Sequence, residues 1–380
     1  MISLTNQAEK LDQDKRRIMN HSFGYHYAPN SVPIAKLAFK YPFGGATERE
    51  GQRGISHLME HLMCKTFDDL RPKMTKLGID HNAYTNNLST VFYFAGLTRF
   101  INEMTPLLVK RLIEHPQLWS RVDFENEKKT VIQEYKDVFN DQLYGTYHNV
   151  MRKEYGYFSA IGCLHDIENF SYDDSLRLSS LYERPSLIVE VGNQSSLVDF
   201  KAIHYDYNYD IVKNRVNSDL LENVPKQGKT IAGVVGQPTD KLQMLAFLSI
   251  CLTGSLEAPL YQEIREKRGL SYYSLGWCLQ IGETSVPLFA ASTSIEKENE
   301  LKEVYTEFFN KKLSDVISEE RFNDCYDQLK IDEEKSNILY HKGVNDFLLS
   351  DFNPFDLKCT YSELIDFGTE QLKILKPFSY

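Results

Sequence analysis

The spacing of apolar side chains predicts both strands and helices in the first half of the chain. Residues 34–41 alternate apolar and polar positions, and residues 90–95 are β-branched and aromatic, so both segments are predicted strands. Residues 100–115 carry apolar side chains three and four positions apart, which is the period of a helix. Residues 123–139 predict a charged helix capped by Asp123. This half therefore mixes the two kinds of element.

The second half of the chain repeats this order of strand, helix, strands and helices. The parallel predicts a structural repeat and hence two similar domains of class α+β, although no repeat of the residues themselves is visible. Residues 205–210 alternate tyrosine with Asp or Asn, and we interpret them as the connection between domains 1–205 and 206–380. The other predicted elements are strands at 187–191, 230–235, 272–281 and 286–293 and helices at 70–77, 240–252, 260–267, 296–313 and 318–341.

Composition narrows the class of protein. The 380 residues are 42% apolar and 12% aromatic, enough for buried cores in two domains. No apolar run reaches the roughly 18 residues of a membrane span, and residues 1–17 lack the apolar segment of a signal peptide, so we expect a cytoplasmic protein. The six cysteines form no CxxC pair and are expected to be reduced. A net charge of −10 without a basic run argues against nucleic acid as a partner.

The segment His57-Leu58-Met59-Glu60-His61 is the strongest candidate for chemistry. On a helix, His57 and His61 lie on one face, where two neutral imidazoles can hold one zinc ion. Glu60 lies at the edge of that face, where a general base is needed. The order His-x-x-Glu-His is the inverzincin pattern. The alternative interpretation is a surface helix with two solvated histidines.

A catalytic zinc site needs a third protein ligand and one open position. Glu127 and Glu134 are seven residues apart and therefore share one face of the predicted helix 123–139. With the histidine motif, this order resembles the pitrilysin/insulysin/mitochondrial-processing-peptidase family. The resemblance implies that Glu134 is the third ligand of one Zn²⁺ per chain and that Glu127 assists catalysis. Taken alone, the two glutamates are more typical of a solvated helix face than of a metal site.

Two more stretches carry the resemblance. Residues 82–85 resemble the family's edge strand, which implies that Asn82 and Ala83 bind the substrate backbone. Residues 260–272 resemble its substrate-binding motif, which implies that Arg265 and Tyr272 contact the substrate and the oxyanion. The family's fold implies a mostly antiparallel mixed sheet packed against helices in each domain, together half of a clamshell. The first domain would be catalytic and the second would bind substrate.

These features predict a zinc-dependent endopeptidase that encloses a peptide in a chamber, with Glu60 as proton acceptor and donor. Half-length family members close their chamber by pairing, so the resemblance implies a homodimer, with a heterodimer of related subunits as the alternative. One departure is the segment 64–67, which reads Cys-Lys-Thr-Phe where relatives often have an aromatic, Lys, Gly and Thr. Two other functions stay open: a non-catalytic subunit of a heterodimeric peptidase, and a metal-dependent hydrolase of another substrate.

Overall fold

A computed structural model shows two compact units, each described separately. The first unit is formed by the described residues of Met1–Tyr135 and Phe158–Asn214, and the second by those of Lys136–Tyr157, Arg215–Gly343 and Ser350–Tyr380. The predicted connection at 205–210, and with it the predicted boundary, lies outside the described residues. The structure describes residues 24–29, 31–115, 118–182, 185–193, 221–225, 228–281, 284–340 and 357–380.

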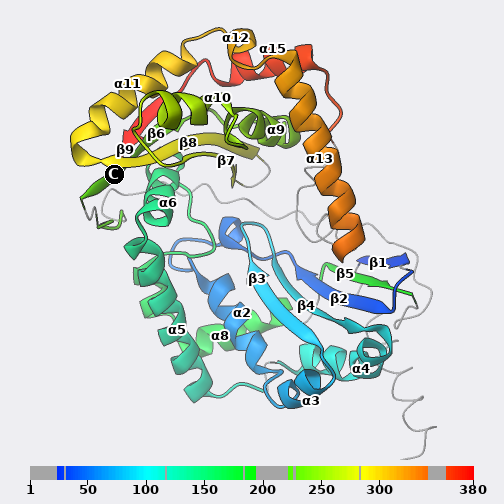
Figure 1. Cartoon of the computed structure of the whole chain (residues 1–380). Coiled ribbons are helices and arrows are strands. Elements are labelled where there is room, and N and C mark those ends of the chain that lie inside the picture. The colour runs from blue at the N-terminus through cyan, green and yellow to red at the C-terminus, as the bar shows by residue number, and fades with distance from the viewer. Residues whose placement is uncertain are drawn as a thin grey trace, which may run out of the picture. The chain divides into compact units, whose positions relative to one another are not determined.

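The first unit is built on a five-stranded sheet with the order β1-β5-β2-β4-β3 (Figure 1). Only β1 and β5 pair in parallel, and the other pairs are antiparallel. β2 begins and ends where the alternating pattern predicts, and β3 lies at the free edge as the family resemblance implies. The strands are β1 (Gly24–Pro29), β2 (Ile34–Tyr41), β3 (Asp80–Thr85), β4 (Thr90–Leu97) and β5 (Leu187–Gly192).

Helices complete the first unit. The motif segment forms α2 (Ile55–Lys65), which packs against β3 and β4. α5 (Arg121–Asn140) buries Val131 and Tyr135 on one side. The prediction that Asp123 caps α5 is wrong, because Ser120 is the residue before the helix and its Oγ accepts from the Asp123 N–H at 3.1 Å. The other helices are α3 (Arg71–Lys76), α4 (Thr98–Glu114), α7 (Leu164–Asn169), α8 (Tyr172–Ser179) and the 3₁₀ turns η1 (Gly45–Thr47) and η3 (Ser180–Tyr182).

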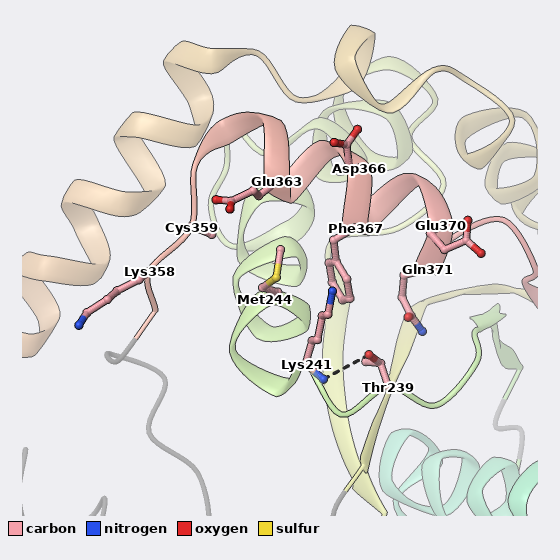
Figure 2. A pocket seen from close by; sticks show the side chains of 10 residues that line it. All are labelled: Thr239, Lys241, Met244, Lys358, Cys359, Glu363, Asp366, Phe367, Glu370 and Gln371. Carbon is pink, nitrogen blue, oxygen red and sulfur yellow. Dashed lines mark hydrogen bonds between the residues drawn. The ribbon is translucent and has the colours of Figure 1, made fainter.

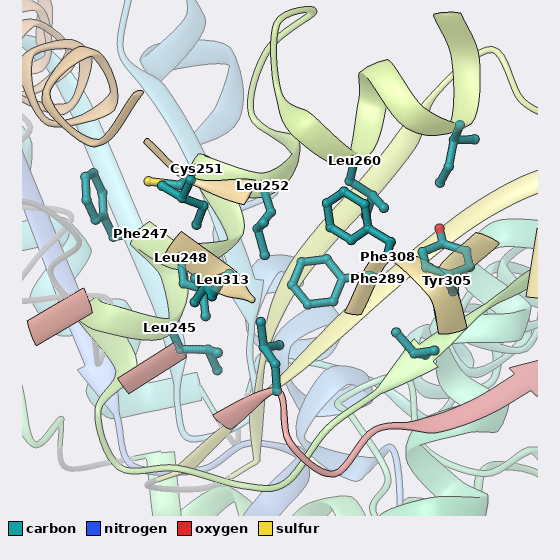
Figure 3. Packing of buried hydrophobic residues seen from close by; sticks show 14 of the residues in the cluster. Leu245, Phe247, Leu248, Cys251, Leu252, Leu260, Phe289, Tyr305, Phe308 and Leu313 are labelled. Carbon is teal, nitrogen blue, oxygen red and sulfur yellow. The ribbon is translucent and has the colours of Figure 1, made fainter. Parts of the chain in front are cut away.

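The second unit has a four-stranded, wholly antiparallel sheet with the order β7-β8-β6-β9. The apolar helix α9 packs on this sheet, and Figure 3 shows its Leu248 and Cys251 in the same buried cluster as Phe289 and Tyr305. The elements are α6 (Gln142–Tyr155), β6 (Lys229–Val235), α9 (Leu242–Thr253), α10 (Pro259–Tyr261), η5 (Gln262–Lys267), β7 (Ser274–Ile281), β8 (Thr284–Ser294), η6 (Ile295–Lys297), α11 (Glu298–Phe309), α12 (Leu313–Val316), α13 (Glu319–Tyr340), α15 (Tyr361–Gln371) and β9 (Lys376–Ser379).

Three boundaries in the second unit differ from the sequence-based prediction. The segment 260–267 is not one α-helix, because α10 passes into the π-helical stretch η5 (Gln262–Lys267). The segment 296–313 is interrupted after α11, which ends at Phe309. β7 begins at Ser274 and so leaves Tyr272 in the loop before it. None of these differences alters the predicted order of elements.

The two sheets share one topology, which confirms the predicted fold class. The order β3-β4-β2-β5 of the first unit corresponds to β7-β8-β6-β9 of the second, with antiparallel pairing throughout both sets. In each unit an inner strand is followed by a helix, and the chain then continues to the edge strand. The inner strand, helix and edge strand are β2, α2 and β3 in the first unit and β6, α9 and β7 in the second. Two α+β units of one fold therefore form the chain. Among the described residues, no helix has the length and apolar character needed to cross a bilayer.

Candidate metal centre

Three side chains of the first unit bring metal-ligating atoms together. His57 and His61 project from one face of α2, with their ring centroids 4.9 Å apart. Glu134 of α5 places Oε2 at 3.3 Å from Nε2 of His57 and at 3.5 Å from Nε2 of His61. Within the described ranges, this is the one group of at least three acidic, His or Cys side chains whose ligand atoms all lie within 4.8 Å of one another.

The donor set of this group fits zinc. Two imidazole nitrogens and one carboxylate oxygen are the ligands of a catalytic zinc site that keeps its fourth position open. The two histidine side chains are 17% exposed and that of Glu134 is 43% exposed, so a small ion and a water molecule can reach the donors. His57, His61 and Glu134 are therefore suited to hold one ion.

Glu127 lies on the other side of the His61 ring. Its Oε2 is 3.0 Å from Nδ1 of His61, and its Oε1 is 2.9 Å from Nζ of Lys65. A carboxylate beside Nδ1 favours the tautomer with the proton on that nitrogen, which leaves Nε2 free to bind a metal. The structure thus places Glu127, predicted as a residue that assists catalysis, in contact with a predicted metal ligand. Lys65 was not predicted to take part.

The charges of this group reinforce one another. Burial lowers the pKa of His61, but the hydrogen bonds to Glu134 and Glu127 outweigh burial and raise the pKa to about 9. The hydrogen bonds to His57 and His61 hold the pKa of the Glu134 carboxyl far below its usual range. In the absence of a metal, His61 is therefore protonated near neutral pH, and its positive charge balances the two neighbouring glutamates.

Glu60 is buried beside the paired histidines on α2, with 8% of the residue exposed. Its Oε2 accepts a hydrogen bond of 2.6 Å from the Thr85 hydroxyl at the end of β3. Thr85 was part of the predicted edge strand, but no motif or spacing indicated that its side chain would reach Glu60. The one indication of this contact was the expectation that the edge strand packs on the motif helix, which brings their side chains close together.

The N-terminus of α2 is held by a buried carboxylate. Its N-cap residue, Gly54, has φ of 98° and no side chain to accept a hydrogen bond. The Glu48 carboxylate takes this role, accepting from the N–H groups of Gly54 and Ser56 at 2.7 Å each. Burial raises the pKa of Glu48 to about 7, against the effect of these two hydrogen bonds and with a contribution from Asp166. No motif or spacing in the sequence indicated this role of Glu48.

The main chain of β3 is open along one side. Asn86 N–H bonds to Ser89 O across the turn that follows β3. Because paired residues alternate in an antiparallel ladder, the main-chain groups of residues 81, 83 and 85 point to the free edge. Ala83 N–H is held there by Oδ1 of Asn82 at 2.9 Å. The predicted substrate-binding residues Asn82 and Ala83 thus lie on a strand edge that can receive another strand.

The other two predicted substrate-binding residues belong to the second unit. The Arg265 guanidinium lies 4.3 Å from the centre of the Tyr272 ring, and Tyr272 is 75% exposed. The predicted pair Arg265 and Tyr272 therefore lies in contact within the second unit. The second unit also has a cavity of about 540 Å³ between α9 and α15, shown in Figure 2, which contains none of the predicted site residues.

Comparisons with known proteins bear on the family and the fold of the chain. Residues 28–162 match the model of the insulinase family, peptidase family M16. An uncharacterized zinc protease of Rickettsia felis is 25% identical over 332 residues, which cover 78% of this chain and 76% of that protein. The crystal structure of a protease from Helicobacter pylori has a TM-score of 0.74 at 19% identity and covers 94% of this chain and 96% of its own. A peptidase M16 inactive domain from Pseudomonas fluorescens has a TM-score of 0.67 at 13% identity, with 93% and 94% covered.

Proposed function

We propose that this chain, which carries an insulinase-family (peptidase family M16) domain at residues 28–162, is a zinc-dependent endopeptidase. The resemblance to a zinc protease family that the sequence predicts is confirmed by this match and by the fold. The observation that carries the proposal of activity is the convergence of His57, His61 and Glu134 with Glu60 beside them. One Zn²⁺ per chain would be held by the first three residues.

The side chains divide the reaction among them. Zn²⁺, when bound, supplies a Lewis acid that favours hydroxide over water near neutral pH and stabilises negative charge on oxygen. The Glu60 carboxylate takes the proton from the attacking water and returns it to the leaving amine. Glu127 keeps the His61 ring in the orientation and tautomer that expose Nε2. Arg265 and Tyr272 are proposed to contact the substrate backbone and the oxyanion.

A peptide would bind by adding a strand to β3. The outward-facing main-chain groups at residues 81, 83 and 85 offer hydrogen bonds to an extended backbone of any sequence. Ala83 N–H would then exchange its bond to Asn82 Oδ1 for one to the substrate. Such binding gives affinity through the main chain, so that preference depends on the side-chain surroundings. Closure of the halves as a clamshell around the peptide is part of this proposal.

The proposal is tested by incubating the zinc-loaded chain with a peptide library and reading cleavage sites by mass spectrometry. We expect cleavage by the wild type and none by Glu60→Gln, with zinc retained in both, because Gln cannot accept the proton. Glu50→Gln, which changes an exposed acid before α2, is the matched control and should cleave like the wild type. Peptide cleavage by Glu60→Gln at the wild-type rate would reject the role of Glu60.

A homodimer is the proposed assembly, with pairing to a related subunit as the second candidate. Sedimentation of the purified chain distinguishes them, since a monomer without activity would contradict the homodimer. The similarity to an inactive M16 domain makes a non-catalytic subunit the second candidate function. That function predicts no cleavage by the zinc-loaded wild type, whereas the complete set of His57, Glu60, His61 and Glu134 favours an enzyme. A cytoplasmic location stays a prediction.

A further inference from the structure

Thr85 joins the motif helix to the edge strand through one short hydrogen bond. Its hydroxyl donates to Oε2 of Glu60 at 2.6 Å, and β3 and α2, which lie side by side in Figure 1, pack against each other. The bond engages one oxygen of the Glu60 carboxylate, Oε2, and not Oε1. The hydroxyl therefore occupies one carboxylate oxygen and leaves the other for a proton.

The Thr85 side chain is itself held in place. Thr85 pairs with Thr90 in the register of β3 and β4, and their Oγ1 atoms are 3.2 Å apart. The Thr90 hydroxyl donates to the carbonyl of Phe43 at 2.9 Å, and the Thr85 hydroxyl donates to Glu60, so the two Oγ1 atoms are in contact without a hydrogen bond between them. A β-branched side chain is also stiff about its first torsion angle. The hydroxyl that meets Glu60 is thus fixed to the sheet and not to a mobile side chain.

The main chain of the same residue faces the free edge of the sheet. The main-chain groups of successive residues in a strand point to opposite sides. The N–H of Asn86 bonds to Ser89 O within the sheet, so the N–H and C=O of Thr85 point to the free edge. These outward groups are where the proposed function places the substrate backbone. One residue therefore has its main chain on the peptide-binding edge and its hydroxyl on the general base.

We infer that Thr85 is a positioning residue that fixes the Glu60 carboxylate relative to the bound peptide. This inference rests on the proposed peptidase function. An unrestrained glutamate can turn about three side-chain torsions, whereas a base must meet its proton within hydrogen-bond reach. The Thr85 hydroxyl holds Oε2, so that Oε1 takes the proton of the attacking water. Loss of the hydroxyl should slow the reaction without weakening the binding of the peptide main chain.

The test compares Thr85→Val with Thr85→Ser in the zinc-loaded full chain. Val keeps the shape and β-branching of Thr but removes the hydroxyl, and Ser keeps the hydroxyl. On the library peptide that the wild type cleaves fastest, we expect Thr85→Val to lower kcat by about 10- to 100-fold with KM and bound zinc unchanged. Thr85→Ser should recover most of kcat. Thr306→Val, which removes an exposed hydroxyl in the second unit, should leave kcat unchanged.

Each other outcome separates this inference from the proposed function. Wild-type kcat in Thr85→Val, or an equal loss of kcat in Thr85→Ser, would overturn the positioning role while the peptidase stands. Loss of zinc or of the folded state in Thr85→Val would show a structural role instead. A zinc-loaded wild type that cleaves no library peptide would overturn the peptidase and, with it, the role of Thr85.

Discussion

Glu127 Oε2 lies 3.0 Å from Nδ1 of His61, on the ring nitrogen that does not face Glu134. His57 has no equivalent, because its Nδ1 is buried and has no hydrogen-bond partner among the described residues. The two imidazoles are therefore oriented differently. His61 is held by a carboxylate that is itself held by Lys65, while His57 depends on its position on α2 and on Glu134.

Glu127→Gln should weaken zinc binding without abolishing it. The amide keeps the size of the side chain but loses the charge that favours a proton on Nδ1 of His61, and partners of this kind typically contribute about 10- to 100-fold to metal affinity. Competition with a chromophoric chelator measures the affinity. Glu125→Gln, at an exposed position of the same helix, is the control and should bind zinc like the wild type. Equal affinities in the two variants would contradict an orienting role.

Glu134→Ala should remove zinc far more completely, by more than about 100-fold in affinity, because it deletes a ligand and not a partner of one. In the metal-free chain it should also lower the pKa of His61 from about 9, since Glu134 is the largest contribution that raises it. NMR titration of the imidazole measures this shift independently of zinc. Lys129→Ala on the same helix should change neither quantity. An unchanged His61 pKa would show that Glu134 does not contact this ring in solution.

The sequence predicts much of the fold, because strands and helices follow from short-range periodicity. The assignment of Glu134 as third ligand came from the family resemblance and stays a prediction. The helix period places His57 and His61 together, and the two-turn spacing places Glu127 and Glu134 on one face. Some missed parts, the helices α6, α8 and α15, carry local capping residues that the prediction did not use. Other missed parts depend on long-range contacts. β9 is a short edge strand that contains Pro377, so its local propensity is poor, and it exists because β6 pairs with it. Glu48 and Thr85 contact the motif helix from loops and strand ends, and the spacing of apolar residues does not predict such contacts.

Glu48→Gln should change how stability depends on pH. The folded chain raises the pKa of Glu48 from 4.5 to about 7, so between these values the folded state binds a proton more tightly than the unfolded state. The contribution of Glu48 to the free energy of unfolding is therefore largest below pH 4.5 and falls, by about 3 kcal/mol, as the pH rises through this window. Gln does not titrate and lacks this dependence.

The stability of Glu48→Gln relative to the wild type should thus improve as the pH is raised from 4.5 to 7. Denaturant unfolding of the metal-free proteins measures it, because removing zinc also removes the pH dependence of zinc binding. Glu296→Gln, at an exposed turn of the second unit, should run parallel to the wild type. A constant difference between Glu48→Gln and the wild type across this range would contradict a raised pKa.

Gly162→Ala should disturb the metal centre from a distance. A Cβ at residue 162 would lie 2.5 Å from the main-chain carbonyl carbon of Arg53 and closer still to Gly54, the N-cap residue of α2, and φ of +75° adds strain. Main-chain atoms cannot turn aside as a flexible side chain can, so the first turn of α2 must shift. We expect a loss of roughly 3 kcal/mol or more in the free energy of unfolding, and weaker zinc binding because α2 carries both histidines.

Gly51→Ala separates the effect of the close contact from that of backbone strain, since Gly51 has φ of +78° but no atom within 4 Å of its Cβ position. It should lose only about 1–2 kcal/mol and keep its zinc affinity. Equal losses in the two variants would mean that backbone strain alone acts and that the contact between Gly54 and Gly162 does not position the helix.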